Sequence, residues 1–206
     1  MRLDRGLYVI TDNALGEQLL PAVEQALLGG AVIVQYRDKS ADPARRLQEA
    51  RDLLALCRRY QRPMLINDDL ALALAVGADG VHLGRSDGSL VAARQQLGDG
   101  AIIGATCHDS LAFAAEAADA GADYLAFGAM YPSGTKPNAR RANPSLLGEA
   151  KSRFGLPVVA IGGINTDNAP ELIAAGADNL AVINDIFGRP FDEIRTRAAM
   201  YHGLFA

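Results

Sequence analysis

The sequence predicts an α/β fold, a single (β/α)8 TIM barrel that spans residues 1–206. A short Gly-Ala or Gly-Ala-Asp signature recurs along the chain, and an apolar run follows each copy. The copies are Gly30-Ala31, Gly77-Ala78-Asp79, Gly121-Ala122-Asp123 and Gly176-Ala177-Asp178. Their glycines are 47, 44 and 55 residues apart, which is the length of two strand–helix units. Four double units give eight strand–helix units, the number that closes a parallel barrel.

The recurring glycine has a physical reason. A helix that ends directly before a strand favours a terminal residue that tolerates positive φ, and glycine does so. A chance repeat of a common Gly-Ala pair would not explain why apolar runs follow at the same offset. A doubly wound open sheet is the main alternative, but the segment Thr11–Gly16 lacks the Gly-x-Gly-x-x-Gly fingerprint of that fold.

The expected strands are continuous apolar runs, which is typical of parallel strands that helices cover. They are Leu7–Thr11, Val32–Gln35, Met64–Ile66, Val81–Leu83, Ile102–Gly104, Tyr124–Phe127, Pro157–Ile161 and Leu180–Ile183. Between them lie segments with helical spacing of apolar residues, such as Leu47, Ala50, Leu54 and Cys57 on one face of the second. The expected helices are Gln18–Leu28, Pro43–Arg59, Leu70–Val76, Leu90–Leu97, Leu111–Ala120, Asn143–Phe154, Ala169–Ala175 and Phe191–Tyr201.

Composition limits the partners. Hydrophobic residues make up 50% of the 206 residues and charged residues 21%, enough apolar surface for one buried core. The net charge of −4 gives no reason to expect nucleic acid or an anionic membrane as a partner. We expect no signal peptide and no membrane span. Cys57 and Cys107 lack metal or redox spacing, so we expect buried thiols and a cytoplasmic protein. The sequence leaves open whether the protein forms a homo-oligomer.

The carboxyl ends of the expected strands carry the polar residues, and chemistry in such barrels is built at those ends. The second strand leads into Gln35, Arg37 and Lys39, which alternation points to the same side. Further strand ends supply Asn67-Asp68, His82 with Asp87, Thr106 with His108, the stretch Tyr131–Pro137, Gly162-Gly163, and Ile183-Asn184. These positions define a candidate site at one end of the barrel.

Each group also has an ordinary structural explanation. Arg37 and Lys39 fit a solvated strand end as well as an anion site. Asp68 fits the N-cap of the next helix, because Asp is a preferred capping residue. Gly162-Gly163 fits a tight turn, although loops after the seventh and eighth strands of these barrels often bind phosphate. Three scattered histidines give no zinc signature, and His82, which lies in a strand, is expected to be packed or hydrogen bonded rather than a metal ligand.

Taken together, these groups indicate a Mg²⁺-dependent enzyme. Carboxylates at neighbouring strand ends, Asp68 and Asp87, suit Mg²⁺ with retained waters. Arg37, Lys39 and Lys136 are expected at the same mouth, and cations together with Mg²⁺ suit a diphosphate leaving group. A second phosphate is expected near Gly163 and the eighth strand end.

Motifs over nearly the whole chain resemble the thiamine phosphate synthase family. They include Tyr8–Thr11, Gln35–Lys39, Leu65–Asp69, Val81–Gly84 with Asp87, Thr135-Lys136-Pro137 and Ala160–Ile164. The resemblance implies that a pyrimidine diphosphate and thiazole phosphate combine to give thiamine phosphate and diphosphate. It implies that Gln35, Arg37, Lys39, Asn67, Thr106 and Lys136 bind the pyrimidine diphosphate, that Asp68 and Asp87 hold Mg²⁺, and that Ser133, Gly134, Thr135, Gly163, Ile183 and Asn184 bind the thiazole phosphate. Of these, Arg37, Lys39, Thr106 and Lys136 are the expected catalytic residues.

The chain departs from the family pattern at Arg85, Thr106 and Asn184, where the family usually has Gln, Ser and Ser. Thr106 keeps the hydroxyl, and Asn184 keeps a backbone N–H and an amide donor. Arg85 could pair with Asp87 or reinforce diphosphate binding. Two alternatives stay open. Thiazole tautomerases resemble the synthase but tend to lose the Mg²⁺ aspartates and to carry a histidine near Ala129. A phosphate-ligand sensor on a barrel scaffold would not need the charged groups retained here.

Overall fold

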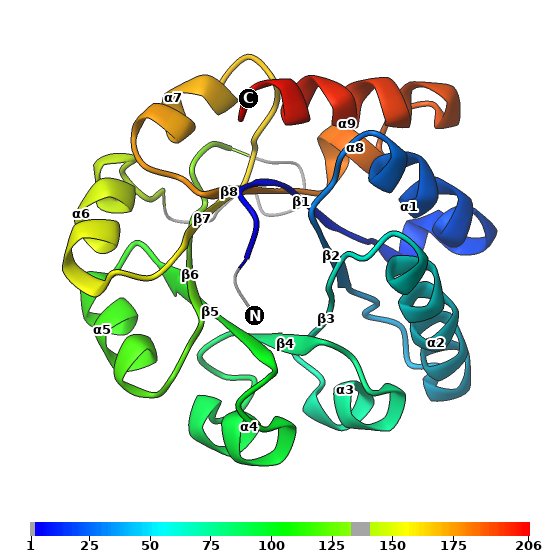
Figure 1. The fold of residues 1–206 in the computed structure, drawn as a ribbon, viewed down its shortest axis with the longest axis horizontal. Helices are drawn as coiled ribbons and strands as arrows, with labels where there is room; N and C mark the ends of the chain where they lie inside the picture. The colour runs from blue at the N-terminus through cyan, green and yellow to red at the C-terminus, as the bar shows by residue number, and fades with distance from the viewer. Residues whose placement is uncertain (1–2, 133–140) are drawn as a thin grey trace.

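The computed structural model describes residues 3–132 and 141–206, and within them the chain forms a closed barrel of eight parallel strands in sequence order (Figure 1). The predicted (β/α)8 fold is therefore confirmed. The strands are β1 Gly6–Ile10, β2 Ile33–Tyr36, β3 Met64–Asn67, β4 Gly80–Leu83, β5 Ile102–His108, β6 Tyr124–Phe127, β7 Val158–Ile161 and β8 Asn179–Val182. Closure comes from β1, which pairs with β2 on one side and β8 on the other.

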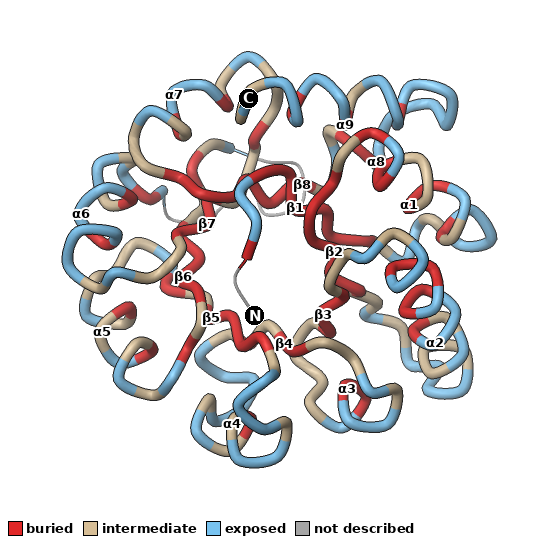
Figure 2. Tube along the Cα trace, viewed as in Figure 1, coloured by how far each residue is buried: buried red, intermediate tan, exposed pale blue. Residues whose placement is uncertain are grey.

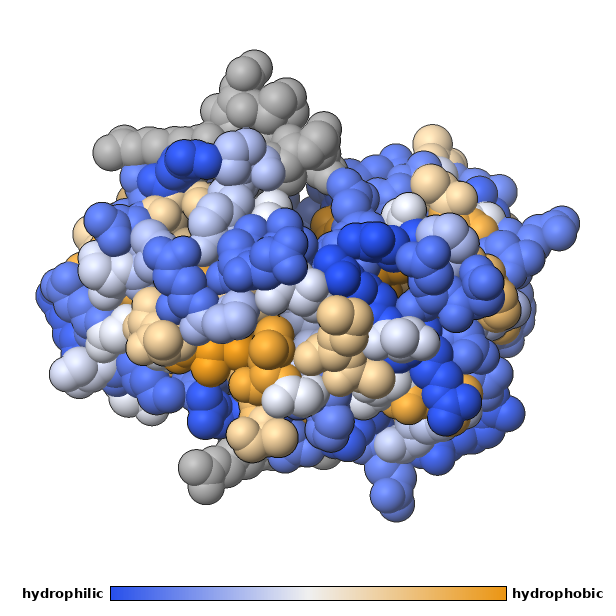
Figure 3. Space-filling view, turned by 90° about the horizontal axis from the view of Figure 1, so that it is seen from above, coloured by the Kyte–Doolittle hydropathy of each residue, from blue (hydrophilic) through white to orange (hydrophobic). Residues whose placement is uncertain are grey.

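Helices form a ring outside the strands (Figure 1). They are α1 Leu19–Leu28, α2 Pro43–Arg59, α3 Leu70–Val76, α4 Leu90–Leu97, α5 Leu111–Asp119, α6 Ser145–Phe154, α7 Ala169–Ala174, α8 Asn184–Phe187 and α9 Ile194–Gly203, with the 3-10 turns η1 Asn13–Gln18 and η2 Phe191–Glu193. The start of α2 shows how the sequence fixes an end: Asp42 accepts a hydrogen bond from Arg45 N, and Pro43 occupies the first turn. The outer face over α7 and α9 is mainly hydrophilic (Figure 3).

The glycine repeat has the backbone conformation that the sequence predicts. Gly30, Gly77, Gly121 and Gly176 have φ values of 99°, 67°, 88° and 113°. Each lies between a helix and the next strand, where the chain reverses direction. A side chain at these positions would be strained, so the signature marks four equivalent helix ends.

Two apolar layers hold the barrel together, one inside the strands and one between strands and helices. Figure 2 shows that buried residues follow the strands, whereas the surrounding helices alternate between buried and exposed residues. The inner layer includes Ile33, Leu65, Ile102 and Val159, and Leu3 packs into it. The outer layer contains both cysteines, which are buried and free as expected. Burial raises the pKa of each thiol to about 12, so these residues pack as hydrophobic groups.

Three details differ from the sequence prediction. The turn η1 and the helix α8 were not expected, because elements of six and four residues show no periodicity. The last helix starts at Ile194 rather than Phe191, after a separate 3-10 turn. β5 extends to His108 through a register shift after Thr106, so it is longer than the apolar run that predicted it.

Candidate active site

The strand β2 directs Gln35 into the barrel and Tyr36 out of it. Gln35 is 2% exposed, and its Nε2 donates a hydrogen bond of 2.6 Å to Tyr8 Oη. Tyr36 Oη instead donates to Glu49 of α2 at 2.7 Å. The expected alternation therefore holds at the end of this strand, and Gln35 belongs to the barrel interior.

Arg37 is held on the β1 side of the mouth. Its guanidinium lies 3.1 Å from the Asp12 carboxylate, and both side chains are largely buried at 18% and 31% exposure. Its backbone N–H donates to Thr11 Oγ1 at 2.9 Å, and Thr11 Oγ1 donates back to the Arg37 carbonyl. Asp12 also caps η1 through Ala14 N. Sequence reasoning missed Asp12, whose signal was its place directly after the first strand.

Lys39 and Asp68 form an ion pair of 3.1 Å between the ends of β2 and β3. Asp68 has a φ of 62°, and Asp69, not Asp68, caps α3 by accepting a hydrogen bond from Leu72 N. The structure thus removes the capping explanation for Asp68. A non-glycine residue with positive φ is costly, so the position of this carboxylate is specified by the surrounding structure.

Asp87 is the second carboxylate at this end, in the segment that follows β4. Its Oδ2 accepts a hydrogen bond from Gly84 N at 3.0 Å, and a Cβ built on Gly84 would lie 2.4 Å from the same oxygen. Glycine at position 84 is therefore needed for this contact. In the part of the chain that the structure describes, no group of three or more Asp, Glu, His or Cys side chains is arranged to hold a metal ion. Two carboxylates fit Mg²⁺ only if substrate phosphate and water complete its ligands.

The interior below this mouth holds a line of polar groups. Tyr8 Oη lies 2.8 Å from Tyr124 Oη, which lies 2.7 Å from His82 Nδ1. His82 Nε2 lies 2.8 Å from Thr106 Oγ1. Burial lowers the pKa of His82 to about 4, and the charge of Asp87 opposes this only in part, so the ring is neutral near pH 7. Burial likewise raises the pKa of Tyr8 and Tyr124.

His82 is hydrogen bonded, as expected, and its two partners lie on other strands, Thr106 on β5 and Tyr124 on β6. Sequence reasoning missed the two tyrosines, because an aromatic residue inside an apolar run is typical of a core position. Asn67 ends β3 at the rim of the same interior, and its Cα is paired with that of His82 across the sheet.

The loop after β7 packs closely against the segment after β6. Gly163 has a φ of 64°, and a Cβ there would lie 2.5 Å from the Pro132 carbonyl oxygen and 2.7 Å from that of Tyr131. Gly162 accepts a hydrogen bond from Tyr131 N at 2.9 Å. The turn is therefore tight, and it also brings the β7 loop against the residues that directly precede Ser133.

The end of β8 runs into α8, with Ile183 at its N-cap and Asn184 as its first residue. A partly buried ion cluster lies behind them, in which Asp185 pairs with Arg197 at 2.8 Å and accepts a hydrogen bond from Tyr201 Oη at 2.8 Å. Tyr201 Oη also lies 3.3 Å from the Ile164 carbonyl. The ends of β7 and β8 are thus fixed to the same phenol of α9.

Four expected site residues, Ser133, Gly134, Thr135 and Lys136, lie outside the described residues. Their approach to the rest of the mouth stays a prediction. Arg85 does not pair with Asp87 in the described structure: its guanidinium stacks on Phe113 at 3.8 Å from the ring centroid, with Glu116 4.0 Å away. A role for Arg85 in diphosphate binding stays a prediction.

Comparison with known proteins gives a consistent result over the whole chain. Residues 7–186 match the family described as thiamine monophosphate synthase. A thiamine-phosphate synthase from Azoarcus sp. (strain BH72) is 55% identical over 203 residues, covering 98% of each chain. One from Marinobacter nauticus is 54% identical over 203 residues, covering 98% of this chain and 91% of its own length.

A solved structure agrees with these sequence relatives. The thiamine phosphate pyrophosphorylase from Pyrococcus furiosus superimposes with a TM-score of 0.87 at 37% identity, and the match covers 98% of this chain and 95% of the other. None of the helices in the described parts of the chain is long and apolar enough to cross a membrane.

Proposed function

The chain belongs to the thiamine monophosphate synthase family, and we propose that its barrel mouth joins 4-amino-5-hydroxymethyl-2-methylpyrimidine diphosphate to thiazole phosphate. The products are thiamine phosphate and diphosphate, and the enzyme is a transferase. The observation that carries the proposal is the paired set of cations and carboxylates at the ends of β1, β2 and β3, Arg37–Asp12 and Lys39–Asp68.

The reaction needs no side-chain nucleophile. The amino group of the pyrimidine donates electron density as the bond between the methylene carbon and the diphosphate oxygen breaks. Diphosphate leaves with the electron pair, and the lone pair of the thiazole nitrogen then forms the new carbon–nitrogen bond. The protein has to stabilise the leaving charge and hold both substrates in place.

Cations at the mouth perform the first task. Arg37, Lys39 and Lys136 bind the diphosphate, with Arg37 already oriented by Asp12. Asn67, Gln35 and Thr106 complete the pyrimidine diphosphate site. Each opposite-charge contact near 4 Å is worth about 4 kcal/mol at an effective dielectric of about 20, before desolvation. Several such contacts account for a large share of the barrier reduction.

Asp68 and Asp87 are the residues that would hold Mg²⁺. When bound, the ion neutralises charge on the diphosphate as it leaves. Asp68 is paired with Lys39, whose side chain is 58% exposed and joined to a long stem. The Lys39 ammonium group is free to turn from the Asp68 carboxylate to a phosphate oxygen. It would therefore pair with Asp68 in the empty site and with the diphosphate in the substrate-bound site.

The thiazole phosphate belongs at the ends of β7 and β8, with Gly163, Ile183 and Asn184, and with Ser133, Gly134 and Thr135 from the loop after β6. The close contact between Gly163 and Pro132 supports this grouping, because it places the β7 loop against the residues that lead into Ser133.

Product analysis tests the proposal. The purified protein is mixed with each substrate alone and with both, and diphosphate and the mass of the organic product are measured. We expect one diphosphate for each thiamine phosphate, and only with both substrates present. A thiazole isomer without diphosphate release would instead indicate a tautomerase, and binding without turnover a sensor.

A further inference from the structure

We propose that Tyr124 and His82 are positioning residues. In the hydrogen-bond chain formed by Gln35, Tyr8, Tyr124, His82 and Thr106, each group donates to the next one. The hydroxyl proton of Thr106, the last member, is therefore free for the substrate. Five strands contribute one residue each, and the four links measure 2.6, 2.8, 2.7 and 2.8 Å. Which substrate atom receives the proton depends on the proposed function, whereas the direction of the hydrogen-bond chain does not.

The direction follows from the first donor. The Gln35 amide nitrogen can only donate, so Tyr8 Oη accepts there and keeps its own proton for Tyr124. If Tyr124 donated to Tyr8 instead, the buried Tyr8 proton would have no acceptor among the described residues, which is unfavourable. Tyr124 therefore donates onward to His82 Nδ1.

The imidazole ring of His82 continues the same order of donor and acceptor. Because Nδ1 accepts from Tyr124, the proton of the neutral ring lies on Nε2, which donates to Thr106 Oγ1. Thr106 then uses an oxygen lone pair for this bond, and its hydroxyl proton is available to an acceptor atom of the pyrimidine diphosphate. The opposite tautomer would turn that hydroxyl inward and leave the substrate facing an oxygen that can only accept.

The barrel makes specific room for this chain. A Cβ on Gly104 of β5 would lie 2.0 Å from Cζ of Tyr124 and 2.2 Å from its hydroxyl oxygen, so only glycine there lets the phenol reach His82. His82 stacks on the Tyr124 ring at 5.6 Å, and Tyr8 meets it edge-on at 6.0 Å. Interiors of such barrels are usually filled by bulky branched residues, which need no such network.

The first test reads the tautomer without activity. Two-bond ¹⁵N–¹H spectra of the imidazole rings of the intact protein at pH 7.5 are compared with those of His82→Gln, which identifies the His82 signals. We expect a protonated Nε2 and an unprotonated Nδ1. A protonated Nδ1, or protons on both nitrogens, would overturn the chain as drawn. In Tyr124→Phe the ring should become a mixture of tautomers.

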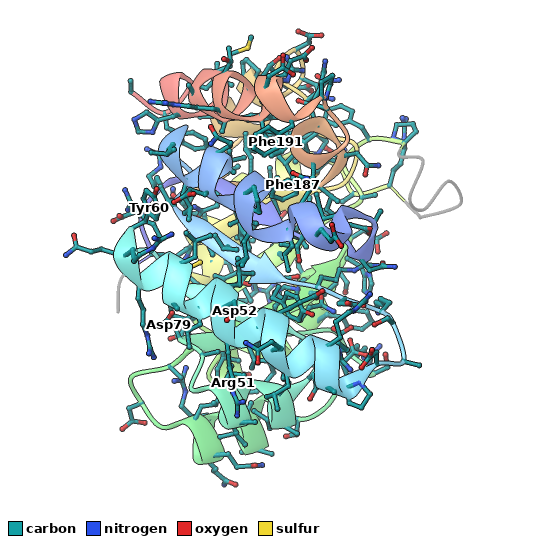
Figure 4. The ribbon with its side chains drawn as sticks, turned by 90° about the vertical axis from the view of Figure 1, so that its right-hand side faces the viewer. Arg51, Asp52, Tyr60, Asp79, Phe187 and Phe191 are labelled. Carbon is teal, nitrogen blue, oxygen red and sulfur yellow. The ribbon has the colours of Figure 1, made fainter. Side chains whose placement is uncertain are left out.

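The second test asks whether Tyr124 acts through Thr106. Tyr124→Phe should lower kcat/KM for the pyrimidine diphosphate about fivefold, the effect of one hydrogen bond. In a Thr106→Val background the same change should have less than a twofold effect. Persistence of the full effect there would contradict the proposal. The control is Tyr60→Phe. Tyr60 lies at the C-terminal end of α2, outside the barrel, and its hydroxyl donates to Glu24 of α1 (Figure 4).

The two proposals can fail separately. The expected His82 tautomer in a protein that releases no diphosphate would refute the proposed function and leave the hydrogen-bond chain standing. Diphosphate release by a protein with the opposite tautomer would do the reverse.

Discussion

The two halves of the barrel mouth are built by different means. At the ends of β2 to β5 the polar groups are side chains that pair with one another, as in Lys39–Asp68 and His82–Thr106. At the ends of β7 and β8 the proposed phosphate site depends mainly on backbone, with a tight turn at Gly163 and the Asp185–Tyr201 hydrogen bond behind it. A departing diphosphate gains negative charge, which charged side chains such as Lys39 can follow and stabilise. A phosphate that is only bound, and does not react, can be held by backbone N–H groups in fixed positions. The comparison predicts different responses to mutation.

Asp68→Asn should have the largest effect, because it removes a proposed Mg²⁺ ligand and the partner of Lys39. We expect kcat to fall about 10³-fold, in line with the loss of a group that stabilises developing charge. Steady-state rates at saturating Mg²⁺ measure it. The matched control is Asp69→Asn, the neighbouring carboxylate that caps α3, which should change stability more than kcat. Equal losses in the two variants would contradict the assignment.

Gly163→Ala should come next, and should act on one substrate only. The added Cβ would lie 2.5 Å from the Pro132 carbonyl, so the β7 loop has to shift. We expect KM for the thiazole phosphate to rise about tenfold, as loss of well-aligned phosphate contacts implies. Gly155→Ala is the control, because Gly155 has a similar φ of 66° but open space around it. Both variants carry backbone strain, but only the first should change KM.

The partly buried imidazole of His82 predicts a moderate effect of pH on the free energy of unfolding. Burial lowers the pKa of His82 from 6.5 to about 4, so below pH 6.5 the unfolded chain binds a proton that the folded chain does not. The contribution of the neutral His82 ring to the free energy of unfolding is therefore fully present above pH 6.5 and is lost as pH falls toward 4. The free energy of unfolding should fall by about 2 kcal/mol between pH 7 and pH 5. Urea unfolding at the two pH values measures this. In His82→Gln that part of the pH dependence should disappear; an unchanged slope would refute the cause.

The smallest effects should come from polar residues near the mouth that the proposed mechanism does not use. Arg85 stacks on Phe113, and His108 is exposed with a φ of 53°. We expect Arg85→Ala and His108→Ala each to change kcat/KM by less than about threefold, as exposed contacts are worth little. Initial rates with both substrates measure this. A dominant loss in His108→Ala would point to proton transfer by that ring and contradict a mechanism without a base.

The fold was largely predictable because it depends on local signals. Asp42-Pro43 marks the start of α2, and the repeated glycine marks four helix ends. The short elements η1 and α8 give no such signal, although α8 carries Asn184. The direction of a candidate site residue was predictable where one strand sets it, as at Gln35, which points into the barrel. It was not predictable where closure of the barrel decides: Tyr8 and Tyr124 are 116 residues apart and meet only across the interior.

The same limit applies to Asp68. Its residue type fits both a helix cap and a metal ligand, and only the structure, with Asp69 in the cap and a positive φ at Asp68, excludes the cap. The metal-ligand role stays a prediction. Backbone conformation at a single non-glycine residue depends on tertiary contacts, so the sequence pattern does not reveal it.

The division of the mouth into two subsites is tested most directly by the KM values of both substrates in two variants, Lys39→Ala and Gly163→Ala. We expect a crossed pattern: Lys39→Ala raises KM for the pyrimidine diphosphate and leaves that of the thiazole phosphate within about twofold, and Gly163→Ala does the opposite. If both variants raised the KM of the same substrate, the two strand-end groups would form a single binding site and the account would be wrong.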